Sequence, residues 1–388
     1  MSCGAQGSRA EVRYIEEVTP GTPPPTGDMQ KLRVTGLGGG VDKSTETPGE
    51  IRPDRQVVDE VMLKKEPNIT INGRMSYDTW DDFFSAAFFA DWIVTDYDSS
   101  TNTVDAEEDT GVYTYTFPVG HGINFVPGGK YLIAGFTNAA NNGVKTVVSV
   151  VGDVVTVEEA LVDELAVTDI TVKSEVLANG VTQKSFTIED EFTDVNKTRT
   201  RTGLVVGDMT LTLASEAIAD IVFNFIGMNV TVQDNSVVTG TPIEPNTNPV
   251  MNSGDNVADI IEGGVLQGLV GGELSLVITN NVRGNNAVGS TENICVANGD
   301  CDVTGSLNVY FTDWTRYQKF LDNSSSSLRF KLDAPGLGAY HFNIPFIKFS
   351  DDEVNAGGPN TDVLANGSYR GLLDPVTAKT VVLTKIDA

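Results

Sequence analysis

Short runs of alternating apolar and polar residues recur along most of the chain and predict β-strands. In KSFTIEDEF, one face carries Phe186, Ile188 and Phe192, whereas the other carries Glu189 and Glu191. Comparable runs are MTLTLAS, ADIVFNFIG, ELSLVITN, SLNVYF, SLRFKLD and AYHFNIPFIKF. About a dozen strands against two helical segments predict a mainly β fold in which a helix packs on a sheet.

Two segments have the spacing of amphipathic helices, SYDTWDDFFSAAFFADW (76–92) and TDWTRYQKFLDN (312–323). In the first, Ser76 is the expected N-cap, and an apolar stripe is formed by Tyr77, Trp80, Phe84, Ala87 and Phe88. The opposite face is acidic, which argues against a membrane-surface helix because such helices are basic. The sequence therefore predicts a helix that docks on its own sheet.

Composition shifts divide the chain into three regions. Residues 1–50 are rich in Gly, Pro and Thr and predict an extended N-terminal arm with one short strand at 31–35. Residues 111–178 contain short strands separated by Gly and Asn turns, and predict a small β-barrel or sandwich inserted into the main domain. The main β domain would then consist of residues 51–110, with strands at 56–63 and 68–71, and residues 179–388.

The chain is acidic, with 53 Asp and Glu against 26 Lys and Arg and a formal net charge of −27. Such a surface repels nucleic acid. The basic residues are segregated, since none occurs between Arg201 and Arg283 or between Arg74 and Lys130. This segregation is typical either of solvated faces or of a subunit whose acidic and basic faces meet those of its neighbours.

No catalytic or nucleotide-binding motif accompanies this pattern. The two histidines, His121 and His341, are far apart in sequence, and adjacent Asp81 and Asp82 would point about 100° apart on a helix. We therefore predict no enzyme activity and no cofactor. A glycosidase, which needs two carboxylates facing each other across a cleft, stays open as an alternative at this point.

Three smaller questions also stay open in the sequence. The acidic segment 96–109 matches several calcium-ligand positions of an EF-hand loop but has Thr101 where that loop needs glycine. Cys295 and Cys301 are close enough in sequence to bridge a loop, whereas Cys3 is isolated. The N-terminus lacks the apolar core of a secretory signal, so we expect the protein to be made in the cytoplasm without inserting into a membrane.

Several phrases, in collinear order, resemble the tail tube (major tail) proteins of long-tailed, non-contractile bacteriophages. They are RYIEEVTPGT, EIRPDRQVVDE, INGRMSYDTWDDFFSAAFFADW, KSFTIEDEFTDV, TNNVRGNNAVGS, TGSLNVYFTDWTRYQKFLDNSSSSLRFKL and AYHFNIPFIKFSDDEVNAGGPNTDV. The region YLIAGFTNAANNGVKTVVSVVGDVVTV resembles a module inserted in some members. None of these phrases is a catalytic signature, and together they span most of the chain.

The resemblance implies a two-sheet β-sandwich with a flanking α-helix, assembled as hexameric rings that stack into a tube. The inner strands of each ring would join into one closed 24-stranded barrel, and genomic DNA would pass through its bore. The resemblance also implies that the protein belongs to the phage virion, and that its partners are further copies of itself, the tape measure protein, and the tail terminator and distal tail proteins.

Charge and alternation suggest residues for these roles. The expected bore-facing residues are Glu189 and Glu191, with Asp208 as a third candidate. Phe89 falls among acids on the outer face of the first helix, where a neighbouring subunit would cover it. Basic residues expected at contacts between subunits are Arg52, Arg55, Lys64 and Lys65. The alternative is a β-sandwich adhesin or carbohydrate-binding protein that uses surface aromatics and carboxylates.

Overall fold

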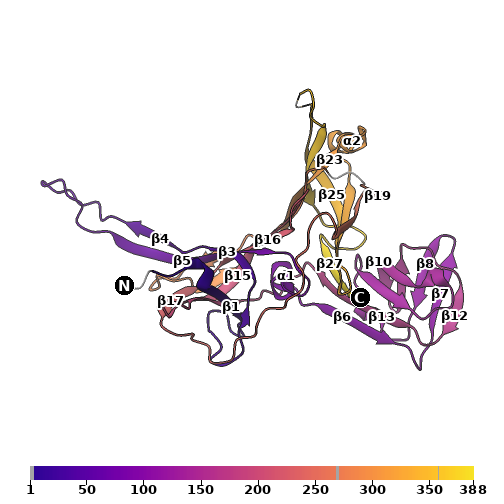
Figure 1. Ribbon diagram of the computed structural model, residues 1–388, viewed down its shortest axis with the longest axis horizontal. Coiled ribbons are helices and arrows are strands. Elements are labelled where there is room, and N and C mark those ends of the chain that lie inside the picture. Colours follow the sequence, from indigo (N-terminus) through magenta and orange to yellow (C-terminus); the bar gives the residue numbers. More distant parts are fainter. Residues whose placement is uncertain (1–3, 268–270, 357) are drawn as a thin grey trace.

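The structure is a computed structural model that describes residues 4–267, 271–356 and 358–388. It is mainly β, as the sequence predicts, and its described residues form two α-helices, α1 (Asp81–Phe88) and α2 (Thr315–Leu321). A long hairpin, a lobe that holds α2 and a compact β region of residues 93–178 extend in three directions from a central body (Figure 1).

The body is organised by one antiparallel sheet of eight strands that runs from the base of the hairpin into the lobe with α2 (Figure 1). Neighbours along the sheet, in order, are β3 (Val34–Gly38), β5 (Val61–Arg74), β16 (Asp220–Ile226), β15 (Lys197–Ala214), β20 (Glu273–Thr279), β23 (Asp302–Tyr310), β26 (Leu364–Gly371) and β25 (Gly338–Asn355). We call it the long sheet.

Two smaller layers branch from the long sheet through β15 and β25, which are 18 residues long. The first half of β15 pairs with β14 and β17, and the first half of β25 pairs with β24 and β27. Further strands extend each layer. The strands beside β15 are β14 (Phe186–Phe192), β1 (Ala10–Glu16), β2 (Gln30–Lys31) and β17 (Asn229–Gln233), and those beside β25 are β24 (Ser326–Ala334), β18 (Val257–Glu262), β19 (Val265–Leu266) and β27 (Val382–Asp387).

Helix α1 fills the space between the long sheet and the layer beside β15. The predicted apolar stripe is confirmed, because all five of its residues are buried, and the ring of Phe83 lies 5.3 Å from Phe223 and 5.4 Å from Phe186. The helix is shorter than predicted and begins after Trp80. Ser76 does not cap it, because the Ser76 hydroxyl hydrogen-bonds to Thr79 instead.

The N-terminal region is not the extended arm that the sequence predicts. β1 pairs with β14 over its whole length and buries Val12 and Tyr14 in the main core, while the Tyr14 hydroxyl donates to Asp82 over 2.7 Å. Gly and Pro residues in this region form turns between short strands. The composition suggests a non-globular arm, whereas these turns connect strands that complete the body.

The projecting element is instead a hairpin of β4 (Val41–Glu46) and the N-terminal half of β5, with its tip at residues 47–60. The sequence predicts two strands here, and the structure has one continuous strand, β5. Pro67 does not end β5, because it lies where the strand changes partner from β4 to β16.

Residues 93–178 form a compact β region with an apolar core of its own that includes Tyr115, Tyr131 and Val155. Tyr97 and Val104 belong to this core, so the region begins before residue 111. Gly122–Asn124 form a short 3-10 turn. Its strands are β6 (Ile93–Asp98), β7 (Val104–Asp109), β8 (Val112–Thr116), β9 (Lys130–Ala134), β10 (Gly143–Val151), β11 (Val154–Val157), β12 (Glu164–Val167) and β13 (Thr171–Ala178).

Backbone pairing of β13 with β27 attaches this region to the body. A bidentate ion pair supports the junction, since Arg329 donates to both carboxylate oxygens of Glu158 over 2.5 and 2.6 Å.

Candidate functional site: the polar face of the long sheet

The two faces of the long sheet differ in chemistry because its strands alternate apolar and polar residues. One face is covered by the core and buries side chains such as Ile71, Met209 and Phe223. The other face is half-exposed or exposed and consists largely of hydroxyl, amide and carboxylate groups. Examples from five strands are Thr70, Asn72, Asp208, Thr210, Asn224, Ser306, Asn308, Asn366 and Ser368. We call this surface the polar face.

Hydrogen bonds between neighbouring strands order the polar face. Thr70 Oγ1 donates to Asn224 Oδ1 over 2.6 Å, and Asn224 Nδ2 donates to Asp208 Oδ1 over 2.7 Å. Further along the sheet, the hydroxyls of Ser275 and Ser306 lie 2.8 Å apart. Side chains paired in this way form a smooth hydrophilic surface rather than a pocket.

The polar face carries more acids than bases. Its acids are Asp208, Asp220, Glu273, Asp302, Asp351 and Glu353, and its bases are Arg74, Lys348 and Arg370. Arg74 is paired with Asp220, and Arg370 with Asp302, which leaves little free positive charge. The surface is therefore hydrophilic and net acidic.

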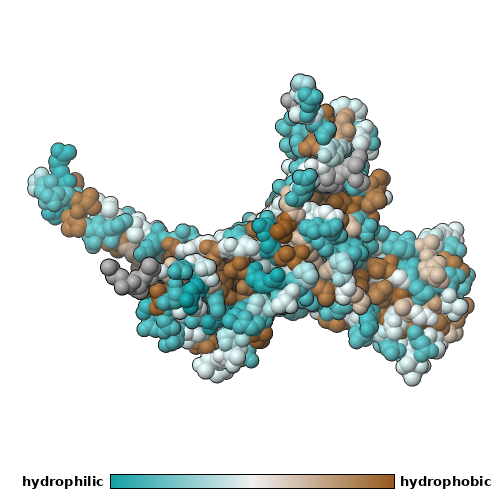
Figure 2. All heavy atoms as spheres, in the orientation of Figure 1, coloured by the Kyte–Doolittle hydropathy of each residue, from teal (hydrophilic) through white to brown (hydrophobic). Residues whose placement is uncertain are grey.

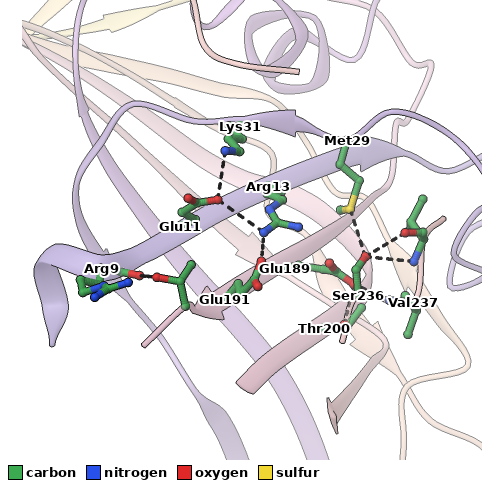
Figure 3. A network of polar contacts seen from close by, with 12 residues as sticks. Arg9, Glu11, Arg13, Met29, Lys31, Glu189, Glu191, Thr200, Ser236 and Val237 are labelled. Carbon is green, nitrogen blue, oxygen red and sulfur yellow. Dashed lines mark hydrogen bonds and ion pairs between the residues drawn. The ribbon is translucent and has the colours of Figure 1, made fainter. Parts of the chain in front are cut away.

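Asp208 lies on the polar face, as the bore-facing prediction requires, and its orientation toward a bore stays a prediction. Glu189 and Glu191 lie elsewhere, on β14 (Figure 3). Glu189 is wrong as a bore-facing residue, because it is fully buried: its Oε1 accepts hydrogen bonds from Thr200 and from the backbone of Val237. Residues around Ser236 cover this face of β14.

Glu191 is more exposed than Glu189 and is neutralised within the subunit. Its carboxylate pairs with Arg13, which also contacts Glu11, and Glu11 in turn contacts Lys31 (Figure 3). Alternation correctly separates the two faces of β14, but both faces are covered near Glu189. The network in Figure 3 therefore ties β1, β2 and β14 together.

The prediction that Phe89 lies on an outer surface is wrong. Phe89 is 5% exposed and packs with Val205 and Val296. The helix ends at Phe88, and Phe89 has φ 50°, so its side chain no longer follows the helical wheel that placed it among acids.

The four basic candidates for subunit contacts all lie on the β4–β5 hairpin. Arg52 and Arg55 are at its exposed tip, where Arg52 pairs with Asp54 over 2.7 Å. Lys64 and Lys65 lie nearer the body and pair with Glu66 and Glu292. Their contact with a neighbouring subunit stays a prediction.

The hairpin also carries apolar side chains that are exposed in the described part of the subunit. Val57 is 76% exposed and Val58 56%, and hydrophobic groups are visible along the hairpin in Figure 2. The full set is Ile51, Val57, Val58, Val61, Met62 and Leu63. We call these residues the apolar strip, and exposed apolar side chains gathered on one element are typical of an interaction surface.

The described residues contain no group of three or more His, Cys, Asp or Glu side chains placed to hold a metal ion. Asp96 and Asp98 lie in β6 and Glu107 in β7, and Cys295 and Cys301 are free thiols. Cys3 lies outside the described residues.

Burial and the nearby Lys130 and Lys331 lower the pKa of His341 to about 3, so it is neutral at pH 7. No helix in the described ranges is long and apolar enough to span a membrane.

Sequence reasoning missed most of the polar face, although a signal for it was present. In NITING, MTLTLA and VFNFIG the polar positions are Thr and Asn rather than charged residues. These positions contribute uncharged polar side chains to the face, and a search for carboxylates passes over them.

One family model, described as phage tail tube protein, matches residues 7–371. The chain belongs to this family of phage tail tube proteins. The match covers the body and the compact region of 93–178, and it makes the protein a structural component of a phage tail. No curated protein matches the chain.

Proposed function

We propose that this tail tube protein assembles into stacked rings whose long sheets join around a bore, and that the polar face lines this bore. The observation that carries the proposal is the asymmetry of the long sheet. Its apolar face is covered by the core, while most side chains of its polar face are half-exposed or exposed in the described part of the chain. Joining such sheets into a closed barrel removes their free edges, and many strands leave a wide aqueous channel.

The charge of the polar face suits the passage of double-stranded DNA. DNA carries one negative charge per ~1.7 Å of helix axis, so a bore lined with free lysines and arginines would hold it tightly. On the polar face, acids outnumber bases and two of the three bases are engaged by Asp220 and Asp302. The DNA would therefore slide without specific binding.

The hairpin supplies a means of joining subunits. Its apolar strip and the tip residues Arg52 and Arg55 extend well away from the body, so they reach a neighbouring copy more readily than their own subunit (Figure 1). Burying a side chain such as valine contributes about 1.5–3 kcal/mol. We propose that the strip docks on an adjacent copy. The tape measure, terminator and distal tail proteins would contact the tube inside and at its ends.

Electron microscopy of the purified protein tests this function. We expect hollow tubes of stacked rings at high protein concentration. A protein that stays monomeric at all concentrations and instead binds glycans would contradict the proposal and favour the adhesin alternative.

A further inference from the structure

We infer that the chain is a tandem repeat of one structural unit, and that the pairing of β15 with β20 inside the chain is the template for the contact between neighbouring chains. In that contact, the C-terminal half of β25 pairs with β3 and the start of β4 of the next chain. The inference rests on the proposed self-assembly and specifies its interface and copy number.

The strand order of the first repeat recurs in the second. The first repeat consists of β1, β2, β3, β5, α1, β14, β15, β16 and β17, and the second of β18, β19, β20, β23, α2, β24, β25, β26 and β27. The pairings recur as well. In the first repeat they are β1–β2, β1–β14, β3–β5, β5–β16, β16–β15, β15–β14 and β15–β17. In the second they are β18–β19, β18–β24, β20–β23, β23–β26, β26–β25, β25–β24 and β25–β27.

The agreement extends to irregularities that topology alone does not dictate. The register of β14 with β15 shifts between Phe186 and Ile188, and that of β24 with β25 shifts between Ser326 and Leu328. The register of β15 with β16 shifts after Val206, and that of β25 with β26 shifts after Phe349. Bulges at equivalent places indicate two copies of one unit rather than two similar sandwiches.

The helices correspond in the same detail. Trp80 is the N-cap of α1 and Trp314 is the N-cap of α2, and neither cap has a side-chain hydrogen bond. In the second repeat, a short connection leads from α2 to β24. In the first, the compact region of 93–178 occupies this place, so it is an insertion into one repeat only.

Comparison of the two repeats shows which strand pairings are absent at the two edges of the long sheet. β20 pairs with β23 on one edge and with β15 on the other, whereas its counterpart β3 pairs only with β5 among the described residues. The second half of β15 pairs with β16 and β20, whereas the corresponding half of β25 pairs only with β26 in the described ranges. Each chain thus offers one free edge of each type.

These two edges are complementary, because the chain already joins their equivalents. Matching the repeats by register places Glu353 at the position of Thr210 and Gly40 at the position of Val277, which are opposite each other in β15 and β20. The next such pair is Asn355 with Gly38. A Cβ added to Gly40 would have no atom within 4 Å, so a larger side chain fits at this position. The contact is head-to-tail and closes into a ring.

The copy number follows from the strand count. Each chain contributes eight consecutive strands to the long sheet, four from each repeat. The resemblance to siphophage tail tubes implies a 24-stranded barrel, which three such chains complete. The ring then contains three chains and six repeats, in place of the six chains expected from the sequence.

Disulfide cross-linking tests both the interface and the copy number. The variant carries Glu353→Cys and Gly40→Cys in a background with Cys3→Ser, Cys295→Ser and Cys301→Ser. Oxidised tubes should give covalent dimers and trimers on a non-reducing gel, with nothing larger. The matched control replaces Gly40→Cys by Glu107→Cys, an exposed position in the inserted region, and should give no such ladder.

The outcomes separate the inference from the proposed function. Tubes that form but yield no cross-link, or a ladder that reaches six chains, would overturn the inference and leave the tube function standing. Absence of tubes from the unmodified protein would overturn the function itself. If the cysteine variant does not assemble, the symmetry of unmodified tubes in cryo-electron microscopy decides: identical six-fold densities would overturn the inference, and three-fold symmetry would support it.

Discussion

At the scale of single residues, burial explains most departures from the sequence-based predictions. The stretch KTRTRT resembles a solvated basic strand, yet Arg201 is fully buried and pairs with buried Asp190, which also binds Arg199. Glu17 is buried too, where it accepts hydrogen bonds from Ser185 and Thr187. Charged residues in this layer are paired within the subunit, so their charge does not mark an exposed face.

Phe89 provides a test of whether a side chain stabilises the subunit internally or lies on an exposed face. Because it packs beneath the surface beside Val205, Phe89→Ala should lower the free energy of unfolding of the free subunit by about 3 kcal/mol. Chemical denaturation measures this loss. Val232→Ala removes methyl groups from a side chain that is 79% exposed, and it should change stability by less than about 0.5 kcal/mol. A Phe89 variant of unchanged stability that no longer assembles would restore the surface role predicted from sequence.

At the scale of elements, the sequence predicts the strands well and their partners poorly. Alternation locates β14, β16, β20, β24 and β25, because half-buried strands keep a period of two. It does not show that β1 adds to β14 or that residues 41–67 form a hairpin, since these depend on contacts between residues far apart in sequence. The repeat has a visible signal, DTWDDFF against TDWTRYQKF, but each helix pattern taken alone predicts only a helix.

Of all the elements, the hairpin is the one whose loss of contact with a neighbouring subunit should impair tube assembly most. Val57→Ser with Val58→Ser removes apolar surface that the subunit does not bury, so folding should be unchanged while the protein concentration needed for tubes rises at least tenfold. Light scattering follows assembly. Val119→Ser with Val151→Ser, at sites in the inserted region that are 94% and 75% exposed, is the matched control. Equal assembly by the two variants would argue against docking by the hairpin.

At the scale of the whole molecule, composition gives a net charge of −27 but not the positions of the charges. Composition predicts that the protein does not bind nucleic acid tightly. It does not identify the surface that DNA would meet, because that surface is assembled from eight strands whose order in the sheet differs from their order in sequence. Of the three residues expected to face the bore, only Asp208 lies on the polar face.

Adding positive charge to the polar face should slow DNA passage. Thr210→Lys with Asn366→Lys places two lysines per chain on this face, whereas Thr101→Lys with Asn102→Lys places two on an exposed loop of the inserted region. Phages built with the first pair should eject DNA several-fold more slowly, and added salt should reduce the difference because it weakens phosphate contacts. Equal ejection by both phages would remove the polar face from the bore.

The insertion of residues 93–178 in only one repeat has a consequence for the outside of the tube. A ring of three chains would have six nearly equivalent repeats around the bore but only three inserted regions, so bulky and bare positions would alternate around its circumference. The DNA would meet an almost six-fold channel, while any molecule that approaches from outside would meet a three-fold surface. One duplicated chain can thus change its exterior without altering the symmetry that its cargo encounters.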